Sequence, residues 1–245
     1  MIDIHCHILP MVDDGSNTME TSLAMLDAAY HDGSDAFILT PHYACEYGFD
    51  NPKEKVMTLF EEFKEIVRQE GIPVTLYPGC EFLFSSVESF NEHFDDITLM
   101  NHTCYQLMEF YFNVEETEII EAVDCVLNSG RIPILAHPER YECMQIADDL
   151  AEMLVERGAL LQMNKGSILG RYGEYAKDAV HHMLEQRLIS FIGSDAHHIR
   201  YRTPMMSEAY DVVAHYYGRR YADRIFYENP QNLLNIQFAI KEELQ

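Results

Sequence analysis

The chain has 245 residues, 47% of them hydrophobic, which is enough to bury a sizeable core. Its 17 Lys and Arg against 41 Asp and Glu give a formal charge of −24, which repels phosphate backbones and argues against nucleic-acid binding. No apolar run reaches the length of a membrane span and no leader-like segment opens the chain, so we expect no membrane insertion and a cytoplasmic protein. Six scattered cysteines without a C-x-x-C pair indicate reduced thiols.

Segments typical of strands alternate with segments typical of helices along the chain. Apolar runs predict strands at 2–5, 36–40, 74–81, 104–110, 132–136, 160–164 and 188–193. Amphipathic stretches predict helices at about 17–32, 51–70, 115–129, 146–157 and 174–186, and helical structure from about residue 204 onward.

This alternation predicts an α/β fold with parallel strands and right-handed crossovers. Seven such units favour closure into a (β/α)7 TIM-like barrel. An open doubly wound sheet is the alternative, but it would normally carry a Gly-rich phosphate loop after an early strand, and the sequence has none. Without a repeat or a linker, residues 1–245 are expected to form one domain with a helical C-terminal segment.

The first predicted strand runs into His5-Cys6-His7. Residues two apart in a strand face the same side, so both imidazoles would point one way and Cys6 would point toward the outer helices. Two imidazoles at this spacing can bind one divalent ion. Alone, the pair is weak evidence, because it could equally be two polar residues near a terminus.

The other predicted strands strengthen this interpretation. In parallel α/β barrels, functional residues lie at the C-terminal ends of the strands. Six of the seven predicted strands carry His, Asp or Glu there: His5, His7, Asp14, His42, Glu81, Glu109, His137, Asp195 and His197. Nitrogen and oxygen ligands without Cys indicate manganese, iron, zinc or magnesium, and nine ligands are too many for one ion.

Several of these residues lie in longer motifs. His5-x-His7, Thr40-Pro41-His42, Gly79-x-Glu81, Ala136-His137-Pro138-Glu139-Arg140 and Ser194-Asp195-Ala196-His197 resemble those of the polymerase-and-histidinol-phosphatase (PHP) superfamily. The opening, from His5 to Pro10 and then Asp13-Asp14-Gly15, is similar to its branch of bacterial manganese-dependent protein-tyrosine phosphatases of capsule and exopolysaccharide operons.

The resemblance implies a distorted (β/α)7 barrel with three divalent ions, manganese first, with iron or zinc as alternatives. It implies His5, His7, Glu81 and Asp195 at the first ion, Glu81, Glu109 and His137 at the second, and Asp14, His42 and His197 at the third. The implied activity is hydrolysis of phosphotyrosine on a protein or peptide, with the tail of a cognate tyrosine autokinase as substrate.

For the chemistry, we expect a metal-bridging hydroxide to attack phosphorus. Arg140 and Arg202 match arginines that the family places at the phosphate, and Arg suits bidentate phosphate contacts. Phenolate needs little help as a leaving group, and a protonated His42 or a metal-bound water could supply the proton.

Other interpretations stay open at this point. One is a small-molecule phosphatase of the histidinol-phosphatase type. Another is a non-catalytic protein that binds metal or phosphotyrosine, which the two arginines argue against. Met11, Lys165 and His198 differ from the residues usual in the branch, and because they flank ligands we expect them to affect substrate preference.

Cys125 and Arg131 have the C-x5-R spacing of cysteine-dependent tyrosine phosphatases. That chemistry needs the Cys after a strand, with a helix N-terminus aimed at the phosphate. Here Cys125 falls inside a predicted helix, so we expect the spacing to be a coincidence.

Overall fold

Parallel strands alternate with helices in the computed structural model of the chain, which describes residues 1–147 and 149–242. The strands are β1 (Ile2–Cys6), β2 (Ala36–Leu39), β3 (His42–Tyr43), β4 (Thr75–Pro78), β5 (Glu81–Leu83), β6 (Tyr105–Glu109), β7 (Ile132–Ala136), β8 (Leu160–Asn164) and β9 (Ile189–Gly193). Each of the seven predicted strands is present, which confirms the α/β class with parallel strands.

The strands form two sheets, β1-β2-β4 and β3-β5-β6-β7-β8-β9, in which every pair of neighbours is parallel. The structure corrects the sequence-based expectation at two strands. β3 was not predicted and follows β2 after a break at Thr40-Pro41, and the predicted strand 74–81 is interrupted at Gly79-Cys80, between β4 and β5. Both breaks fall just before a predicted ligand, His42 or Glu81, so each ligand begins a new short strand.

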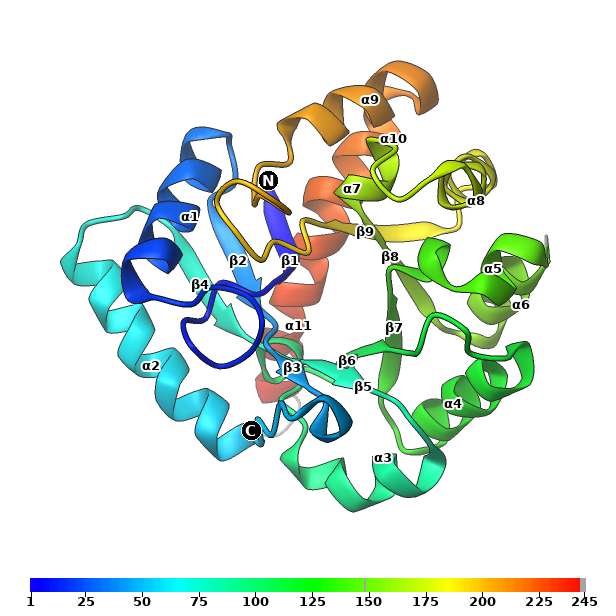
Figure 1. Cartoon of the computed structure of the whole chain (residues 1–245), viewed down its shortest axis with the longest axis horizontal. Helices are drawn as coiled ribbons and strands as arrows, with labels where there is room; N and C mark the ends of the chain where they lie inside the picture. The colour runs from blue at the N-terminus through cyan, green and yellow to red at the C-terminus, as the bar shows by residue number, and fades with distance from the viewer. Residues whose placement is uncertain (148, 243–245) are drawn as a thin grey trace.

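The helices lie outside the strands (Figure 1). They are α1 (Met19–His31), α2 (Lys53–Gln69), α3 (Val87–His93), α4 (Glu116–Asn128), α5 (Glu142–Ile146), α6 (Leu150–Arg157), α7 (Lys165–Ile168), α8 (Glu174–Glu185), α9 (Ser207–Tyr217), α10 (Arg219–Asp223) and α11 (Asn229–Glu242). None of these described helices combines the length and the apolar character needed to cross a membrane.

Helix α2 shows why these segments become helices. Its buried residues Val56, Phe60, Phe63 and Val67 recur every three or four positions and form one apolar face. That face packs in one cluster with the outward side of β2, which includes Phe37. Cys6 belongs to the same cluster, so it faces the outer helices as predicted.

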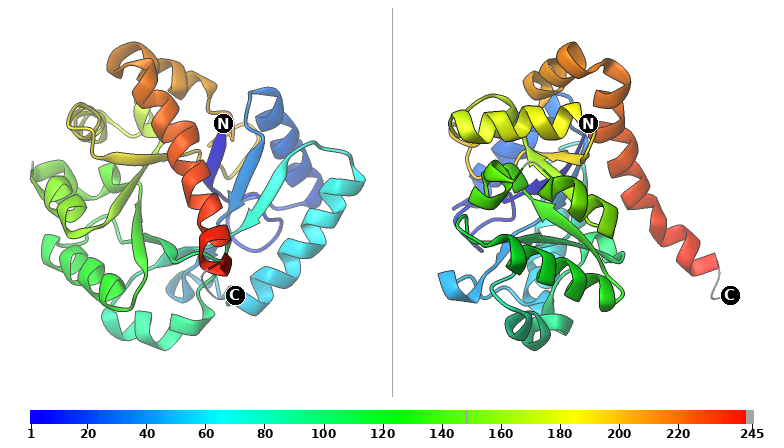
Figure 2. Two further views of the ribbon diagram at one scale, coloured as in Figure 1. Left: turned by 180° about the vertical axis from the view of Figure 1, so that it is seen from behind. Right: turned by 90° about the vertical axis from the view of Figure 1, so that its right-hand side faces the viewer.

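The inward side of the strands forms a second apolar cluster that includes Ile4, Ile38 and Ile134. Leu233 and Leu234 of α11 belong to it, and Asn229 donates a hydrogen bond to the carbonyl of Ser190. Figure 2 shows α11 crossing the strands on the side opposite the view of Figure 1. The C-terminal helices therefore cover the end of the sheets where the strands begin, and the other end is left for the side chains of a site.

Several helical segments differ from the prediction. The predicted helix 146–157 is present as α6, which starts later, at Leu150. α5 precedes it and was not predicted; α5 ends where Ala147 leaves helical geometry, with φ of −94° and ψ of 107°. Helix α3 was not predicted. Ser86 caps it by accepting a hydrogen bond from the backbone nitrogen of Ser89. Where helical structure was expected from about residue 204, the described residues form helices between Ser207 and Glu242.

We expect Leu233→Ala to lower the free energy of unfolding by about 2–4 kcal/mol, because Leu233 is only 1% exposed within the inward cluster. Urea unfolding measures the change. Asn232→Ala, at an exposed position of the same helix, is the matched control. Equal effects of the two substitutions would show that α11 does not pack as described.

Candidate metal centre

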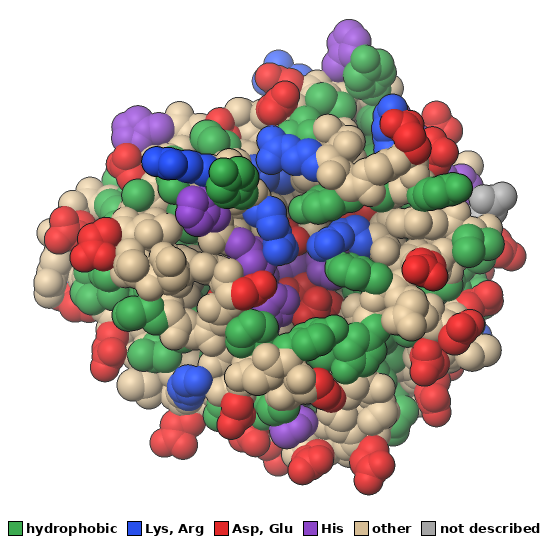
Figure 3. Space-filling model, viewed as in Figure 1, with side chains coloured by type: hydrophobic (Ala, Val, Ile, Leu, Met, Phe, Trp, Pro, Cys, Tyr) green, Lys and Arg blue, Asp and Glu red, His purple; other side chains and the backbone are tan. Residues whose placement is uncertain are grey.

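The nine predicted ligands lie together at the C-terminal ends of the strands. His5 is in β1 and Glu109 ends β6, whereas His42 and Glu81 begin β3 and β5. The remaining ligands are in the loops that follow β1, β7 and β9: His7, Asp14, His137, Asp195 and His197. Figure 3 shows histidine, acidic and basic side chains gathered in a hollow at the centre of this face.

The carboxylate of Glu81 is the centre of the cluster. Its Oε2 lies 3.1 Å from His5 Nε2, 3.2 Å from His7 Nε2 and 3.2 Å from His42 Nδ1. Its Oε1 lies 3.0 Å from His137 Nε2. A single buried carboxylate thus connects four imidazoles, which come from β1 and the loop after it, from β3 and from the loop after β7.

A second group of ligands lies nearer the entrance. Asp14 Oδ1 is 3.3 Å from His197 Nε2 and 3.5 Å from His42 Nε2. Glu109 Oε1 is 2.9 Å from His42 Nδ1. Three sets of side chains have ligand atoms within 4.8 Å of one another: His7, Asp14, His42 and His197; His5, His7 and Glu81; and His42, Glu81 and Glu109.

These sets resemble the three ligand groups expected from the sequence, but more residues belong to two sets at once. His7 and His42 each belong to two of them. Asp195 and His137 belong to none, although Asp195 Oδ1 lies 3.7 Å from His5 Nε2 and His137 is bonded to Glu81. The assignment of each ligand to one ion remains a prediction.

The donor atoms fit divalent cations. Glu81 Oε2 and His197 Nε2 are buried without a hydrogen-bond partner among the described residues, although charged groups surround both. Buried polar atoms are normally paired. A cation among these oxygen and nitrogen atoms would satisfy both, and this donor set suits manganese, iron or zinc.

The electrostatics of the protein without metal follow from the same contacts. Burial lowers the pKa of His5, but the carboxylates of Glu81 and Asp195 outweigh burial and raise this pKa to about 9. Burial likewise lowers the pKa of His42, and Glu81 and Glu109 raise it to about 10. Burial raises the pKa of Glu81, but His5 and His42 bring it well below its usual value. Protons thus occupy the imidazoles of His5 and His42 when cations are absent.

Residues that the sequence did not single out orient the ligands. His7 Nδ1 donates to Asp13 at 2.8 Å, and Asp13 also accepts from the backbone nitrogens of His42 and Gly15. A Cβ on Gly15 would lie 2.3 Å from the carbonyl oxygen of His7, so only glycine allows this close approach. Partners of this kind fix the ring orientation of metal-binding imidazoles.

Gln162 and Asn164 of β8 likewise orient two predicted ligands, His5 of β1 and Asp195 of the loop after β9. Gln162 Oε1 accepts from His5 Nδ1 at 2.7 Å and its amide donates to Asn164 Oδ1. Asn164 in turn donates to Asp195 Oδ2 at 2.5 Å. The strand 160–164 was the one predicted strand without a ligand, and two polar residues two positions apart at its end were the signal for this role.

The backbone is strained beside the ligands. His137, Asp195 and Arg202 have φ angles of 37°, 50° and 46°, in the left-handed region that disfavours residues with a side chain. Each such residue costs about 1–3 kcal/mol and persists where the surrounding structure holds it. Arg202 is held by a hydrogen bond from Nη2 to the carboxylate of Asp195.

Both predicted phosphate arginines reach the site. Arg202 is bonded to Asp195, and Arg140 Nη1 lies 3.8 Å from Asp195 Oδ2. The guanidinium of Arg140 stacks between Phe112 and Tyr172, with its Cζ 4.3 Å and 4.5 Å from the two ring centroids. The cavity at this end has a volume of about 460 Å³ and is lined by Asp14, His42, Tyr47, Phe49, Glu81, Glu109, Phe110, Tyr111, Phe112, His137, Arg140 and Arg202.

Cys125 lies in α4, away from this cavity, and Arg131 does not follow a phosphate loop. Arg131 instead donates to Gln106 Oε1 and to the carbonyl of Phe94, and stacks on the Phe94 ring. Both contacts are structural. The C-x5-R spacing is therefore a coincidence, as expected.

The family described as "Capsular polysaccharide synthesis, CpsB/CapC" matches residues 1–235. The chain belongs to the CpsB/CapC family. It is 29% identical to the tyrosine-protein phosphatase CpsB of Streptococcus pneumoniae, over 96% of this chain and 98% of that protein. It is 32% identical to the tyrosine-protein phosphatase YwqE of Bacillus subtilis, over 100% of this chain and 96% of that protein.

The fold agrees with this membership. A crystal structure from a study of YwqE and S. pneumoniae CpsB, described as "unique metal-dependent tyrosine phosphatases", superposes with a TM-score of 0.88. The identity is 32%, and the alignment covers 96% of this chain and 94% of that one. The resemblance stated from the motifs is thereby confirmed at the level of the family.

The three residues expected from the sequence to affect substrate preference lie in different surroundings. Met11 is 68% exposed at a φ of 61°, a position that favours glycine. His198 Nδ1 accepts from the backbone nitrogen of Arg200. Lys165 is buried, and its amine donates to Thr203 Oγ1 at 3.0 Å and to the carbonyl of Met205. Lys165, the first residue of α7, therefore connects the segment after β8 to the loop that carries Arg202.

We expect metal to stabilise this CpsB/CapC protein more strongly as pH rises. Protonated His5 and His42 stabilise the metal-free protein fully below their unfolded pKa of about 6.5, and this contribution is lost as pH rises toward their folded pKa values of about 9 and about 10. Bound cations need these imidazoles deprotonated, so protons compete with metal.

Urea unfolding at several pH values between about 6 and 8, with a chelator or with excess manganese, measures this difference. The increase in the free energy of unfolding that manganese causes should become larger as the pH rises over this range. A gain that does not change with pH would contradict the protonation states described above.

We expect Asp13→Ala to weaken metal binding by about 10–100-fold, because His7 loses the carboxylate that orients its ring. Competition against a metal-binding dye measures the affinity. Asp178→Ala removes an exposed carboxylate from α8 and is the control. Unchanged affinity in the Asp13 variant would rule out the orienting role.

Proposed function

We propose that the chain is a metal-dependent protein-tyrosine phosphatase that hydrolyses phosphotyrosine on a protein or peptide. The observation that carries the proposal is one cavity in which the cluster of metal-ligand side chains lies beside Arg140 and Arg202. The names of the relatives in S. pneumoniae and B. subtilis support the same activity. A purely structural metal site would have no use for two phosphate-binding arginines.

We assign three divalent ions to the cluster, with manganese the first choice and iron or zinc the alternatives. His5, His7, Glu81 and Asp195 would hold the first ion, Glu81, Glu109 and His137 the second, and Asp14, His42 and His197 the third. When bound, the ions supply a water nucleophile of lowered pKa and offset charge on the phosphoryl oxygens.

The residues of the chain bind and orient the phosphate. Arg140 is pre-organised by its two aromatic neighbours, and Arg202 by Asp195, so neither guanidinium has to be ordered when substrate binds. His42 lies in the cavity wall beside Glu109. In the metal-free protein it is protonated, whereas as a ligand of the third ion it would be deprotonated.

Aromatic walls favour phosphotyrosine over phosphoserine. Tyr47, Phe49, Tyr111 and Phe112 line the cavity, and Phe112 is 47% exposed at its entrance. A phenyl ring gains contact area and edge-to-face packing against such walls. The side chain of phosphoserine has no ring to place there.

We further propose that the substrate is the tyrosine-containing tail of a cognate autokinase that controls capsule or exopolysaccharide synthesis. The family description, which refers to capsular polysaccharide synthesis, supports this setting. Such a substrate would place the enzyme in the cytoplasm. There its six cysteines, all unpaired in the structure, stay reduced.

We interpret the two sheets as one distorted (β/α)7 barrel, and the chain as a single domain. Backbone hydrogen bonds from His7 to Ala196 and from Asp195 to His5 connect the end of β1 to the segment after β9, at 2.9 Å and 2.8 Å. The backbone nitrogen of Glu81 donates to the carbonyl of Pro41, which links the start of β5 to the residue before β3.

Turnover of phosphotyrosine, phosphoserine and histidinol phosphate, after removal of metal and separate addition of manganese, iron, zinc or magnesium, tests the proposal. We expect phosphotyrosine to be the preferred substrate and manganese to support the highest rate. Absence of phosphotyrosine turnover with every metal would overturn the proposal. Preferred hydrolysis of histidinol phosphate would favour the small-molecule alternative.

We expect Arg140→Met to lower kcat/KM for phosphotyrosine by about 10²–10³-fold, because the variant keeps the aliphatic packing and loses the phosphate donors. Arg140→Lys should recover part of the loss. Cys125→Ser is the control and should leave turnover intact. Loss of activity in the folded Cys125 variant would instead favour a cysteine mechanism.

A further inference from the structure

A second cavity lies beside the one that holds the proposed metal site. Its volume is about 420 Å³, and the two cavities share Phe110 and Tyr111. These residues follow Glu109 directly in the chain, so the wall between the cavities begins next to a predicted ligand. We call the second cavity the acidic groove; its lining residues are Phe84, Ser85, Ser86, Val87, Glu88, Phe110, Tyr111, Asn113, Val114, Glu118 and Glu121.

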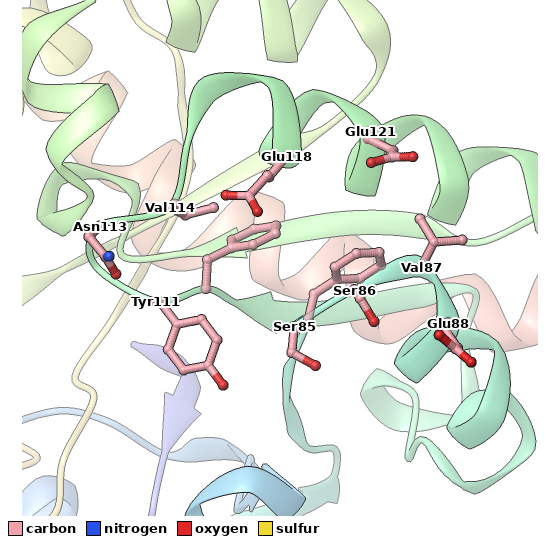
Figure 4. A pocket seen from close by; sticks show the side chains of 11 residues that line it. Ser85, Ser86, Val87, Glu88, Tyr111, Asn113, Val114, Glu118 and Glu121 are labelled. Atoms are coloured by element: carbon pink, nitrogen blue, oxygen red, sulfur yellow. The ribbon is translucent and has the colours of Figure 1, made fainter.

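The acidic groove has an apolar floor and carboxylates at its rim. Figure 4 shows Glu118 and Glu121 on one side, from α4, and Glu88 on the other, from the start of α3. Phe84 and Phe110 are buried beneath them, with their ring centroids 5.9 Å apart. A long aliphatic chain with a positive end matches this combination, because its stem can pack on the floor while its charge stays at the rim.

The carboxylates of the groove lack basic partners. Glu88 and Glu121 form no ion pair with any residue that the structure describes, and no Lys or Arg is among the lining residues. Glu118 differs, because it accepts a hydrogen bond from the backbone nitrogen of Glu115 and so helps to cap α4. Glu88 and Glu121 are therefore the two carboxylates available to a ligand.

The groove is also hydrogen-bonded to the segment around Tyr47, which lines the cavity of the proposed metal site. Ser85, at its edge, donates a hydrogen bond to Glu46. Glu46 precedes Tyr47, which lines the active-site cavity and packs edge-on against Tyr111 with a centroid distance of 5.8 Å. A peptide chain that leaves the active site along Tyr111 would thus enter the groove.

Resting on the proposed phosphatase activity, we propose that the acidic groove binds the Lys or Arg side chain of a residue close to phosphotyrosine in the substrate peptide. Because the two cavities share a wall, we place this residue within about three positions of the phosphotyrosine, at about 3.3–3.6 Å per extended residue. The formal charge of −24 repels a phosphopeptide, and a basic residue next to phosphotyrosine offsets that repulsion at the entrance to the site.

Short alanine-based peptides with one central phosphotyrosine test the proposal on the unaltered enzyme. Lys is placed in turn at each of the three positions on either side, and norleucine, which keeps the stem without the charge, is the matched control. We expect kcat/KM to be about two- to fivefold higher for Lys than for norleucine at one position, as for exposed ion pairs. High salt should reduce this preference.

Two matched double variants then test whether the carboxylates of the acidic groove cause the preference for Lys. Glu88→Gln with Glu121→Gln removes the two available carboxylates, one from α3 and one from α4. Glu92→Gln with Glu116→Gln removes two exposed charges from the same helices outside the groove. We expect the first pair to abolish the Lys preference and the second to keep it, while both pairs hydrolyse free phosphotyrosine at the rate of the unaltered enzyme.

The outcomes separate the two proposals. Normal turnover of free phosphotyrosine without a Lys preference at any position would overturn the groove proposal alone. A preference that survives in the Glu88 and Glu121 variant would overturn it as well. Absence of turnover on free phosphotyrosine and on every peptide would overturn the phosphatase proposal, and the groove proposal with it.

Discussion

The buried carboxylate of Glu81, which contacts four imidazoles, is the interaction on which the site depends. A buried charge is costly unless partners compensate it. Here the partners come from β1, β3 and the loops after β1 and β7, so the strands must converge for Glu81 to remain ionised. The same charge raises the pKa of His5 and His42, which links protonation, metal binding and stability.

The fold supplies this convergence through interrupted strands. β3 and β5 are short strands that start at the ligands, after breaks at Pro41 and Gly79-Cys80. A proline has no backbone N–H for a continuous ladder, and a glycine permits close packing, here against Ile38. The breaks therefore let His42 and Glu81 turn into the centre. The amides of Gln162 and Asn164 then hold His5 and Asp195 from β8.

Charge is divided unequally around the active-site cavity. Arg140 and Arg202 line it, although the chain as a whole is strongly acidic. The neighbouring acidic groove has the opposite character, with free carboxylates above an apolar floor. Under the two proposals made above, the cavity would bind phosphate and the groove a positive side chain a few residues away along a bound peptide.

The sequence alone determined the seven strands, the parallel α/β class and the nine ligand candidates, because strand ends in such folds are local features that apolar runs reveal. It also indicated that Cys6 faces outward, from the two-residue period of a strand. It did not reveal the roles of Asp13, Gln162 and Asn164, since neutral amides and a second aspartate become informative only beside their imidazoles.

Only the tertiary structure decided which chain segments lie opposite one another in the two cavities. Helix α3, a short segment without a strong apolar period, was missed, and the acidic groove exists only where α3 lies opposite α4. The stacking of Arg140 between Phe112 and Tyr172 likewise joins residues from three loops. Such contacts depend on chain segments that are distant in sequence, and no local pattern encodes their separation in space.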